Sequence, residues 1–351
     1  MAARAIACIA ACALAVGCDQ GHQDDQAVQG PPVKLVASNI TGSNLPTAGR
    51  IELAFDRLLA PLSITRQTFV LTDKRGTFFA PAVEYDPVAR VVTITPDKQL
   101  QDQQFYQLLI AAPQSPTDMN GLRAIDGATL DPSVNPKIVF QAAANAPMQP
   151  VPPTVDFCKD ILPLFSNCNG AGCHAGGVQS AAGLILSTPQ TIAATAVGRV
   201  SQEANTGPRA VAQPPGLIFG IDMPILDPGA GAPAAGDPAD SWMLYKLLMA
   251  APTAQATITQ PPYCDGGMPA PPTMGPMHSI AWQPLSDDER ARLANLVPGR
   301  EMPFPTNVSA PLNQNTRALT VDELELVSRW IGQPRAGGTP LVPATCGACV
   351  P

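Results

Sequence analysis

Apolar and polar residues alternate with a period of two along the first part of the chain, from about residue 33 to residue 141. In the segment RIELAFD, residues 50–56, this alternation places Ile51, Leu53 and Phe55 on one face of an extended strand. Similar short runs, separated by Pro, Gly and Asp residues, occur at 68–73, 77–86, 90–96, 104–112 and 136–140. Short strands at this spacing predict an all-β sandwich over 33–141.

The pattern changes to a helical period after a Pro/Ala-rich segment at 142–153, which predicts an extended linker. We expect helices within 154–167, 237–250, 285–297 and 319–332. Thr154, Ser286 and Thr320 stand where N-terminal caps belong, and Gly332 is the expected end of the last helix. Long loops rich in Gly, Pro and Ala separate these helices, and packing around a cofactor is one reason for such loops in a compact domain.

The N-terminus has the pattern of an export signal. Arg4 precedes an apolar run that is too short for a permanent membrane span, so we expect residues 1–17 to be a signal peptide. The letters AVGC, ending at Cys18, resemble the lipobox of bacterial lipoproteins. That resemblance implies a lipid on Cys18, a flexible tether over 18–32, and an exported protein anchored to the outer membrane or facing the periplasm. The alternative is ordinary signal-peptide cleavage near Cys18, with no lipid attached to this residue.

Composition adds to this picture. The net charge of the 351 residues is −7 and there are no basic runs, so nucleic acid is not an expected partner. With 40 prolines and 28 glycines, the chain is rich in loops.

Export would place the cysteines in an oxidising compartment, where unligated cysteines pair. We expect disulfides among four of them: Cys158, Cys264, Cys346 and Cys349. The CGAC of the C-terminal tail, 336–351, could instead be a redox pair, but no βαβ pattern surrounds it.

The candidate chemistry lies in the stretch CNGAGCH, which contains Cys168, Cys173 and His174. A c-type haem is attached when two thiols add to its vinyl groups and the next residue, histidine, ligates the iron. The usual spacing has two residues between the cysteines, whereas this motif has four, two of them glycines that allow the chain to bulge. A Cys168–Cys173 disulfide is one alternative. A zinc site, for which CGAC would have to supply further ligands, is another.

The order of the β-strand motifs resembles the bacterial Ig-like domains of the SbsA type. The matching stretches are LAFDRLLAPLSITRQTFVL, VEYDPVARVVTITPDKQLQDQQFYQLLI and TDMNGL, which cover nearly all of the segment 33–141. The resemblance implies an Ig-like β-sandwich that acts as a spacer or adhesion module and carries no catalytic residues.

The segment 154–335 resembles the cytochrome c-like domains of large secreted bacterial proteins. Four blocks occur in the family's order: FCKDILPLFSNCNGAGCHAG, AGLILS, GDPADSWMLYKL, and REMPF followed by LTVDELELVSRWI. The resemblance implies a mainly α domain with long loops and one covalent haem c. Cys168 and Cys173 would form the thioether bonds, and His174 would be the proximal iron ligand. The four-residue spacing and the long loop before GDP depart from the family's pattern.

A haem with two axial ligands needs a second one opposite His174. We expect Met302, in REMPF, because a thioether raises the reduction potential and Pro303 stiffens its loop. Met268, in GGMPAPP, is the competing candidate. Aromatic residues on the predicted helices would be natural walls for a porphyrin, namely Trp242, Tyr245 and Trp330. The alternative for each is ordinary packing in the core, which is the commoner place for an aromatic residue on a helix.

These features predict a lipid-anchored electron carrier rather than an enzyme: an Ig-like spacer that presents a single-haem domain to a redox partner protein, which the sequence does not identify. Two other functions stay open. With no methionine ligand, the haem would reduce a small oxidant such as peroxide. With a Cys168–Cys173 disulfide and no haem, the chain would be a structural surface lipoprotein.

Overall fold

The computed structural model describes residues 29–42, 44–115, 118, 120–165, 168, 173–175, 180–206, 219–229, 235–253, 277–303 and 317–347. The expected signal peptide, the lipid-anchor residue Cys18 and most of the tether lie outside these described residues. So do three other residues singled out above, Cys264, Met268 and Cys349.

The N-terminal part consists of two four-stranded sheets, which confirms the all-β expectation. One sheet has the order β1 (Leu35–Ser38), β3 (Ile51–Phe55), β6 (Val91–Thr95), β5 (Ala82–Asp86), and all its pairs are antiparallel. The other has the order β2 (Asn44–Pro46), β8 (Lys137–Ala143), β7 (Phe105–Ile110), β4 (Phe69–Asp73), in which only β2 and β8 run parallel. Phe55 and Phe69, one from each sheet, meet edge to face in the shared core, with ring centroids 6.5 Å apart.

Strand β3 is buried on both faces. Ile51, Leu53 and Phe55 belong to the core between the sheets, as their alternation predicts. Glu52 and Ala54 are also fully buried, because the opposite face of this sheet is covered by the rest of the chain. The carboxylate of Glu52, for example, accepts hydrogen bonds from the backbone N–H and the hydroxyl of Ser279.

The second part contains short helices joined by long connections. These are the π-helical turn η2 (Phe157–Ile161), α2 (Leu162–Phe165), η4 (Ala181–Gly183), α3 (Pro189–Thr195), α4 (Trp242–Leu248), α5 (Asp287–Leu296) and α6 (Val321–Gly332). A 3₁₀ turn, η1 (Pro61–Ser63), lies in the sandwich. All four predicted helical segments contain helix, and α3 is an addition.

The caps follow the sequence with one exception. Ser286 accepts a hydrogen bond from the Glu289 N–H at the start of α5, and Thr320 forms a full capping box with Glu323 at the start of α6. The cap predicted at Thr154 is wrong, because the chain turns helical two residues later and Asp156 accepts from the Lys159 N–H.

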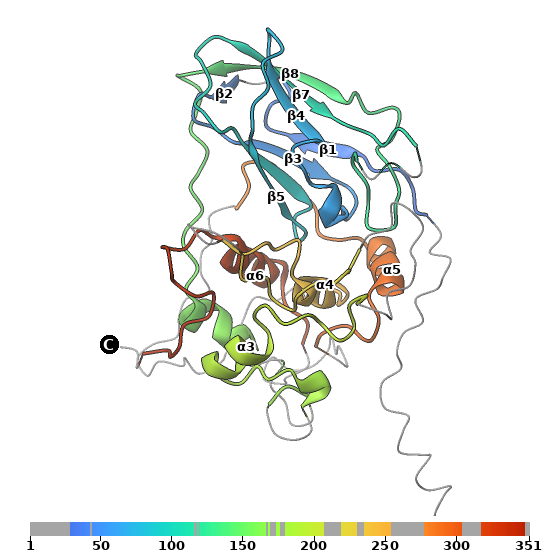
Figure 1. Ribbon diagram of the computed structural model, residues 1–351, viewed down its shortest axis with the longest axis vertical. Coiled ribbons are helices and arrows are strands. Elements are labelled where there is room, and N and C mark those ends of the chain that lie inside the picture. Colours follow the sequence, from blue (N-terminus) through green and yellow to red (C-terminus); the bar gives the residue numbers. More distant parts are fainter. Residues whose placement is uncertain are drawn as a thin grey trace, which may run out of the picture.

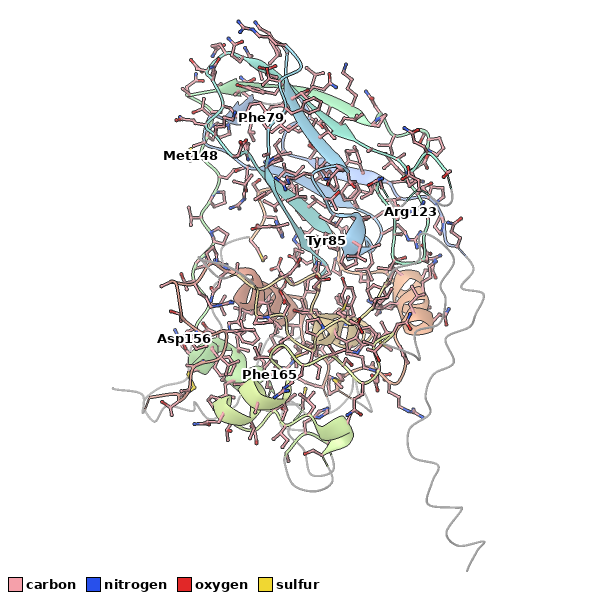
Figure 2. All side chains as sticks on the ribbon, in the orientation of Figure 1. Phe79, Tyr85, Arg123, Met148, Asp156 and Phe165 are labelled. Atoms are coloured by element: carbon pink, nitrogen blue, oxygen red, sulfur yellow. A yellow bond between two sulfur atoms is a disulfide. The ribbon has the colours of Figure 1, made fainter. Side chains whose placement is uncertain are left out.

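The molecule has three layers (Figure 1): the β2–β8–β7–β4 sheet, then the β1–β3–β6–β5 sheet, then the helices α4, α5 and α6, with α3 farthest from the sandwich. Tyr85 of β5 lies where the sandwich meets the helices, and Asp156 and Phe165 lie in the helical part (Figure 2). Leu58, Val88 and Ile125 of the sandwich belong to the core of the helical part. The two parts therefore share a buried interface besides the connection through 142–153.

A disulfide joins Cys158, in the first helical turn, to Cys346 near the end of the chain. This bond pairs two of the four cysteines expected to form disulfides, and it leaves Cys346 unavailable for a redox pair within CGAC. No helix in the described ranges is long and apolar enough to cross a membrane.

Candidate functional site

The two cysteines of the motif follow helix α2 in the sequence, and Cys168 belongs to the core of the helical part. Cys168 is buried and Cys173 is half-buried, and both are free thiols. The disulfide alternative is therefore not formed in this structure. Burial raises the pKa of the Cys168 thiol to about 12, with a further contribution from Cys173, so Cys168 is protonated at neutral pH.

Two backbone hydrogen bonds hold His174 in place, one to Cys168 before it and one to Leu186 after it. Its N–H donates to the Cys168 carbonyl at 3.2 Å, and its own carbonyl accepts from the Leu186 N–H at 2.9 Å. The 184–186 segment is in turn fixed by α3, where the Thr195 hydroxyl accepts from the Ile185 N–H. His174 is 6% exposed.

The tautomer of His174 follows from its hydrogen bond. Nδ1 lies 3.0 Å from the Leu184 carbonyl oxygen, and because a carbonyl only accepts, Nδ1 must carry the proton. Burial lowers the pKa of the imidazole, opposed by the Leu184 carbonyl and by Glu203. A neutral imidazole with its proton on Nδ1 leaves the lone pair of Nε2 available to a metal ion, and a backbone carbonyl on the other nitrogen is the usual way to orient such a ligand.

His174 faces a cavity of about 360 Å³. The cavity is lined by the 182–184 segment, the end of α3, the 199–203 segment, α4 and Met302, and it is partly open to solvent. Met302 is half-buried, and its backbone N–H donates to the Lys246 carbonyl of α4 at 3.1 Å. The Met302–Pro303 peptide bond is cis. The structure thus brings His174 and Met302, 128 positions apart in sequence, to the walls of one cavity.

Of the three predicted aromatic walls, only Trp242 lines this cavity. Tyr245 instead donates its hydroxyl proton to the Ala239 carbonyl and packs edge to face on Phe219. Trp330 packs between Phe157 and Phe165 and donates to the Leu341 carbonyl, and is therefore a core residue. For Tyr245 and Trp330 the structure therefore agrees with the alternative of ordinary core packing and not with a place in the cavity wall.

The cavity also contains residues that sequence reasoning missed. Met243, beside Trp242 on α4, is a second thioether in the cavity wall. The charged residues in the described part of the lining are two cations, Lys246 and Arg199, and one carboxylate, Glu203. The block GDPADSWMLYKL contains Met243 and Lys246, and the four-residue spacing of Trp242 and Lys246 was the available signal that both lie on one side of a helix.

Lys246 is 2% exposed and bound on two sides. Its Nζ lies 2.7 Å from Oε2 of Glu203 and donates to the Pro298 carbonyl at 2.8 Å. Nearby, Trp242 is 3% exposed, and its indole Nε1 has no hydrogen-bond partner among the described residues. A buried donor without an acceptor is destabilising, so this N–H is a candidate donor to a ligand in the cavity.

These observations fit a haem. Nε2 of His174 is available, and Met302 offers a thioether in the same cavity. The cavity also supplies apolar walls, cations and the Trp242 N–H. Cys168 and Cys173 precede His174 but are not among the residues that line the cavity. A zinc site fits less well. Within the described ranges no group of three or more His, Cys, Asp or Glu side chains could hold a metal ion, and Cys346 is bonded to Cys158.

Comparisons with known proteins add little. No family model and no curated protein matches the chain. Among solved structures, the S-layer protein SbsC matches with a TM-score of 0.25 and 18% identity over 36% of this chain and 15% of that one. Native α2-macroglobulin from Escherichia coli, domains MG0-NIE-MG1, matches with a TM-score of 0.25 and 16% identity over 37% of this chain and 36% of that one. This chain thus spans much less than two thirds of either, and TM-scores this low carry no argument about fold or function.

Proposed function

We propose that the protein is an exported, lipid-anchored electron carrier with one covalent haem c. The observation that carries this proposal is the state of His174. It is buried, its Nδ1–H donates a hydrogen bond to the Leu184 carbonyl, it lines the same cavity as Met302, and it follows the free thiol of Cys173 in the sequence. A bound haem would supply one-electron chemistry by cycling its iron between the ferrous and ferric states.

The chain's own residues would bind and orient that group. Cys168 and Cys173 would form the thioether bonds, His174 would ligate the iron through Nε2, and Met302 would supply a second iron ligand. The Leu184 carbonyl would keep the imidazole in one tautomer and one orientation. The apolar residues that α3 and α4 contribute to the cavity wall would limit the access of water to the group.

The cellular setting belongs to the same proposal. Cys18 would carry the lipid, and the sandwich would hold the haem domain at a fixed orientation, because buried contacts and not only the 142–153 segment connect the two parts. The Cys158–Cys346 disulfide supports export, since disulfides persist in oxidising compartments. The partner would be a neighbouring redox protein.

The test is expression of the full chain together with a cytochrome c maturation system. The proposal predicts a red protein that keeps its haem after denaturation and has a low-spin spectrum in both oxidation states. A colourless product would overturn it. A haem-loaded but high-spin product would support reduction of a small oxidant instead, because an open iron position can bind peroxide.

A further inference from the structure

The wall of the cavity formed by α4 has the chemistry of a carboxylate site. Trp242 and Lys246 are four residues apart on α4, and both line the cavity. Arg199 lines it as well, and Glu203 is the carboxylate among the lining residues. With His174 neutral, two cations and one anion give the described part of this lining a formal charge of +1, although the whole chain has a net charge of −7.

The Trp242 side chain has little freedom to find an acceptor elsewhere. Its ring stacks on Phe219, with centroids 6.1 Å apart and an interplanar angle of 25°. On another side it contacts Gly220, where a Cβ atom would come within 2.9 Å of the ring. Its backbone N–H is bound to the Pro224 carbonyl. The indole N–H is therefore held in one direction and buried, and no residue in the described part of the chain accepts from it.

We infer that Trp242 and Lys246 form a subsite for a carboxylate group of the ligand in this cavity, which for a haem is a propionate. The indole would donate its N–H to the carboxylate, and Lys246 would supply the balancing charge beside it. This inference rests on the proposed function and deepens it, because it assigns the side of the cavity that receives the acidic edge of the macrocycle.

The charge on Lys246 favours an anion here and not a neutral acceptor. A nearby cation keeps a carboxylate ionised, and an ionised carboxylate accepts a hydrogen bond from an N–H more strongly than a neutral acceptor does. Glu203 neutralises part of that charge, and its side chain is 39% exposed, so water shares in solvating it. Lys246 is almost fully buried and is therefore the cation whose field acts most strongly inside the cavity.

The experiment uses the haem-loaded full chain and the variant Trp242→Phe, which keeps an aromatic ring at this position but removes the indole N–H. Ultraviolet resonance Raman spectra report whether an indole N–H is hydrogen-bonded, and subtracting the W242F spectrum from the wild type isolates Trp242. Trp330, whose Nε1 donates to Leu341, is the internal reference for a bonded indole. We expect Trp242 to have the bonded signature as well.

A second readout is the reduction potential as a function of pH. Loss of a donor to the ionised carboxylate raises the pKa of that carboxylate, so the pH range over which the potential changes should shift upward in W242F. The matched control, Trp282→Phe, replaces a tryptophan that does not line the cavity and should leave that range unchanged. If W242F does not accumulate, the spectra of W282F and W330F identify the signals of Trp282 and Trp330. The indole signal that remains then belongs to Trp242, because the chain has three tryptophans.

The outcomes are distinct. A protein without haem overturns both the proposed function and the subsite. A protein with haem in which the Trp242 indole is unbonded, or in which W242F and wild type have the same pH profile, overturns the subsite alone. A bonded indole together with the upward shift supports it.

Discussion

Arg57 of the sandwich and Glu289 of α5 form a buried ion pair, with Nε and Oε2 2.8 Å apart. The same guanidinium binds Asp126 at 2.6 Å, and the other oxygen of Glu289 accepts the Leu58 N–H. This network lies between the sandwich and the helices and fixes one against the other.

Replacing one member of this network should be costly. Glu289→Ala leaves the buried Arg57 with a single carboxylate, and the loss of one partner from a buried ion pair typically costs ~3–5 kcal/mol. We expect the free energy of unfolding, measured with urea, to fall by that amount. Asp287→Ala is the matched control, because this exposed residue of the same helix pairs only at the surface with Arg290 and should change little. Equal effects of the two substitutions would contradict a structural role for the network.

The sandwich could be predicted from the sequence because strand alternation is local. The burial of Glu52 could not. Its carboxylate pairs with Arg50 and accepts from Ser279, which is 227 positions away. Alternation alone would place a glutamate at that position toward water, and the polar partners that make its burial possible come from a distant segment.

The Cys/His motif at 168–174 could also be recognised in the sequence, whereas the cavity could not be predicted from it. Its walls come from segments whose approach depends on tertiary packing. All seven residues of α4 are buried, so Met243 and Lys246 could not be assigned to a cavity from a one-sided apolar stripe. Only the spacing of Trp242 and Lys246 indicated that the two side chains share a face.

The interface should also make stability depend on pH. Burial raises the pKa of Glu325 to about 7, with Asp86 and Asp322 adding to the rise and His278 and Arg329 opposing it. The folded state therefore holds a proton that the unfolded chain releases near its ordinary pKa of 4.5. The contribution of Glu325 to stability is present below that pH and is lost as the pH rises towards about 7.

Glu325→Gln should remove that slope. Because the side chain is partly exposed, we expect the wild type to lose on the order of 1–2 kcal/mol more than the variant over this range. Urea unfolding at several pH values measures the difference. Parallel pH profiles for wild type and variant would show that Glu325 is ionised in the folded protein.

The disulfide between Cys158 and Cys346 should stabilise the helical part. The two residues are 188 positions apart, so the bond removes much of the freedom of the unfolded chain. The double variant Cys158→Ser/Cys346→Ser should lose ~2–5 kcal/mol in its free energy of unfolding. A reductant should lower the melting temperature of the wild type more than that of the variant, and an equal response would contradict this contribution.

The assignment of the second axial ligand can be tested by comparing two methionines of the cavity. In the haem-loaded protein, Met302→Ala should abolish the sulfur-to-iron charge-transfer band and lower the reduction potential, because a thioether ligand raises that potential. Met243→Leu keeps an apolar side chain and should leave both unchanged. Loss of the band in M243L, or in Met268→Leu, would contradict the assignment of Met302 and would identify the substituted methionine as the ligand.

The central claim is that Cys168 and Cys173 hold a haem across a four-residue gap. The most direct measurement is the intact mass of the denatured protein after expression with the maturation system. The wild type should carry the mass of one haem, Cys346→Ser should keep it, and Cys168→Ala/Cys173→Ala should lose it. A wild-type protein with the mass of the polypeptide alone, or a haem retained by the double variant, would contradict the account.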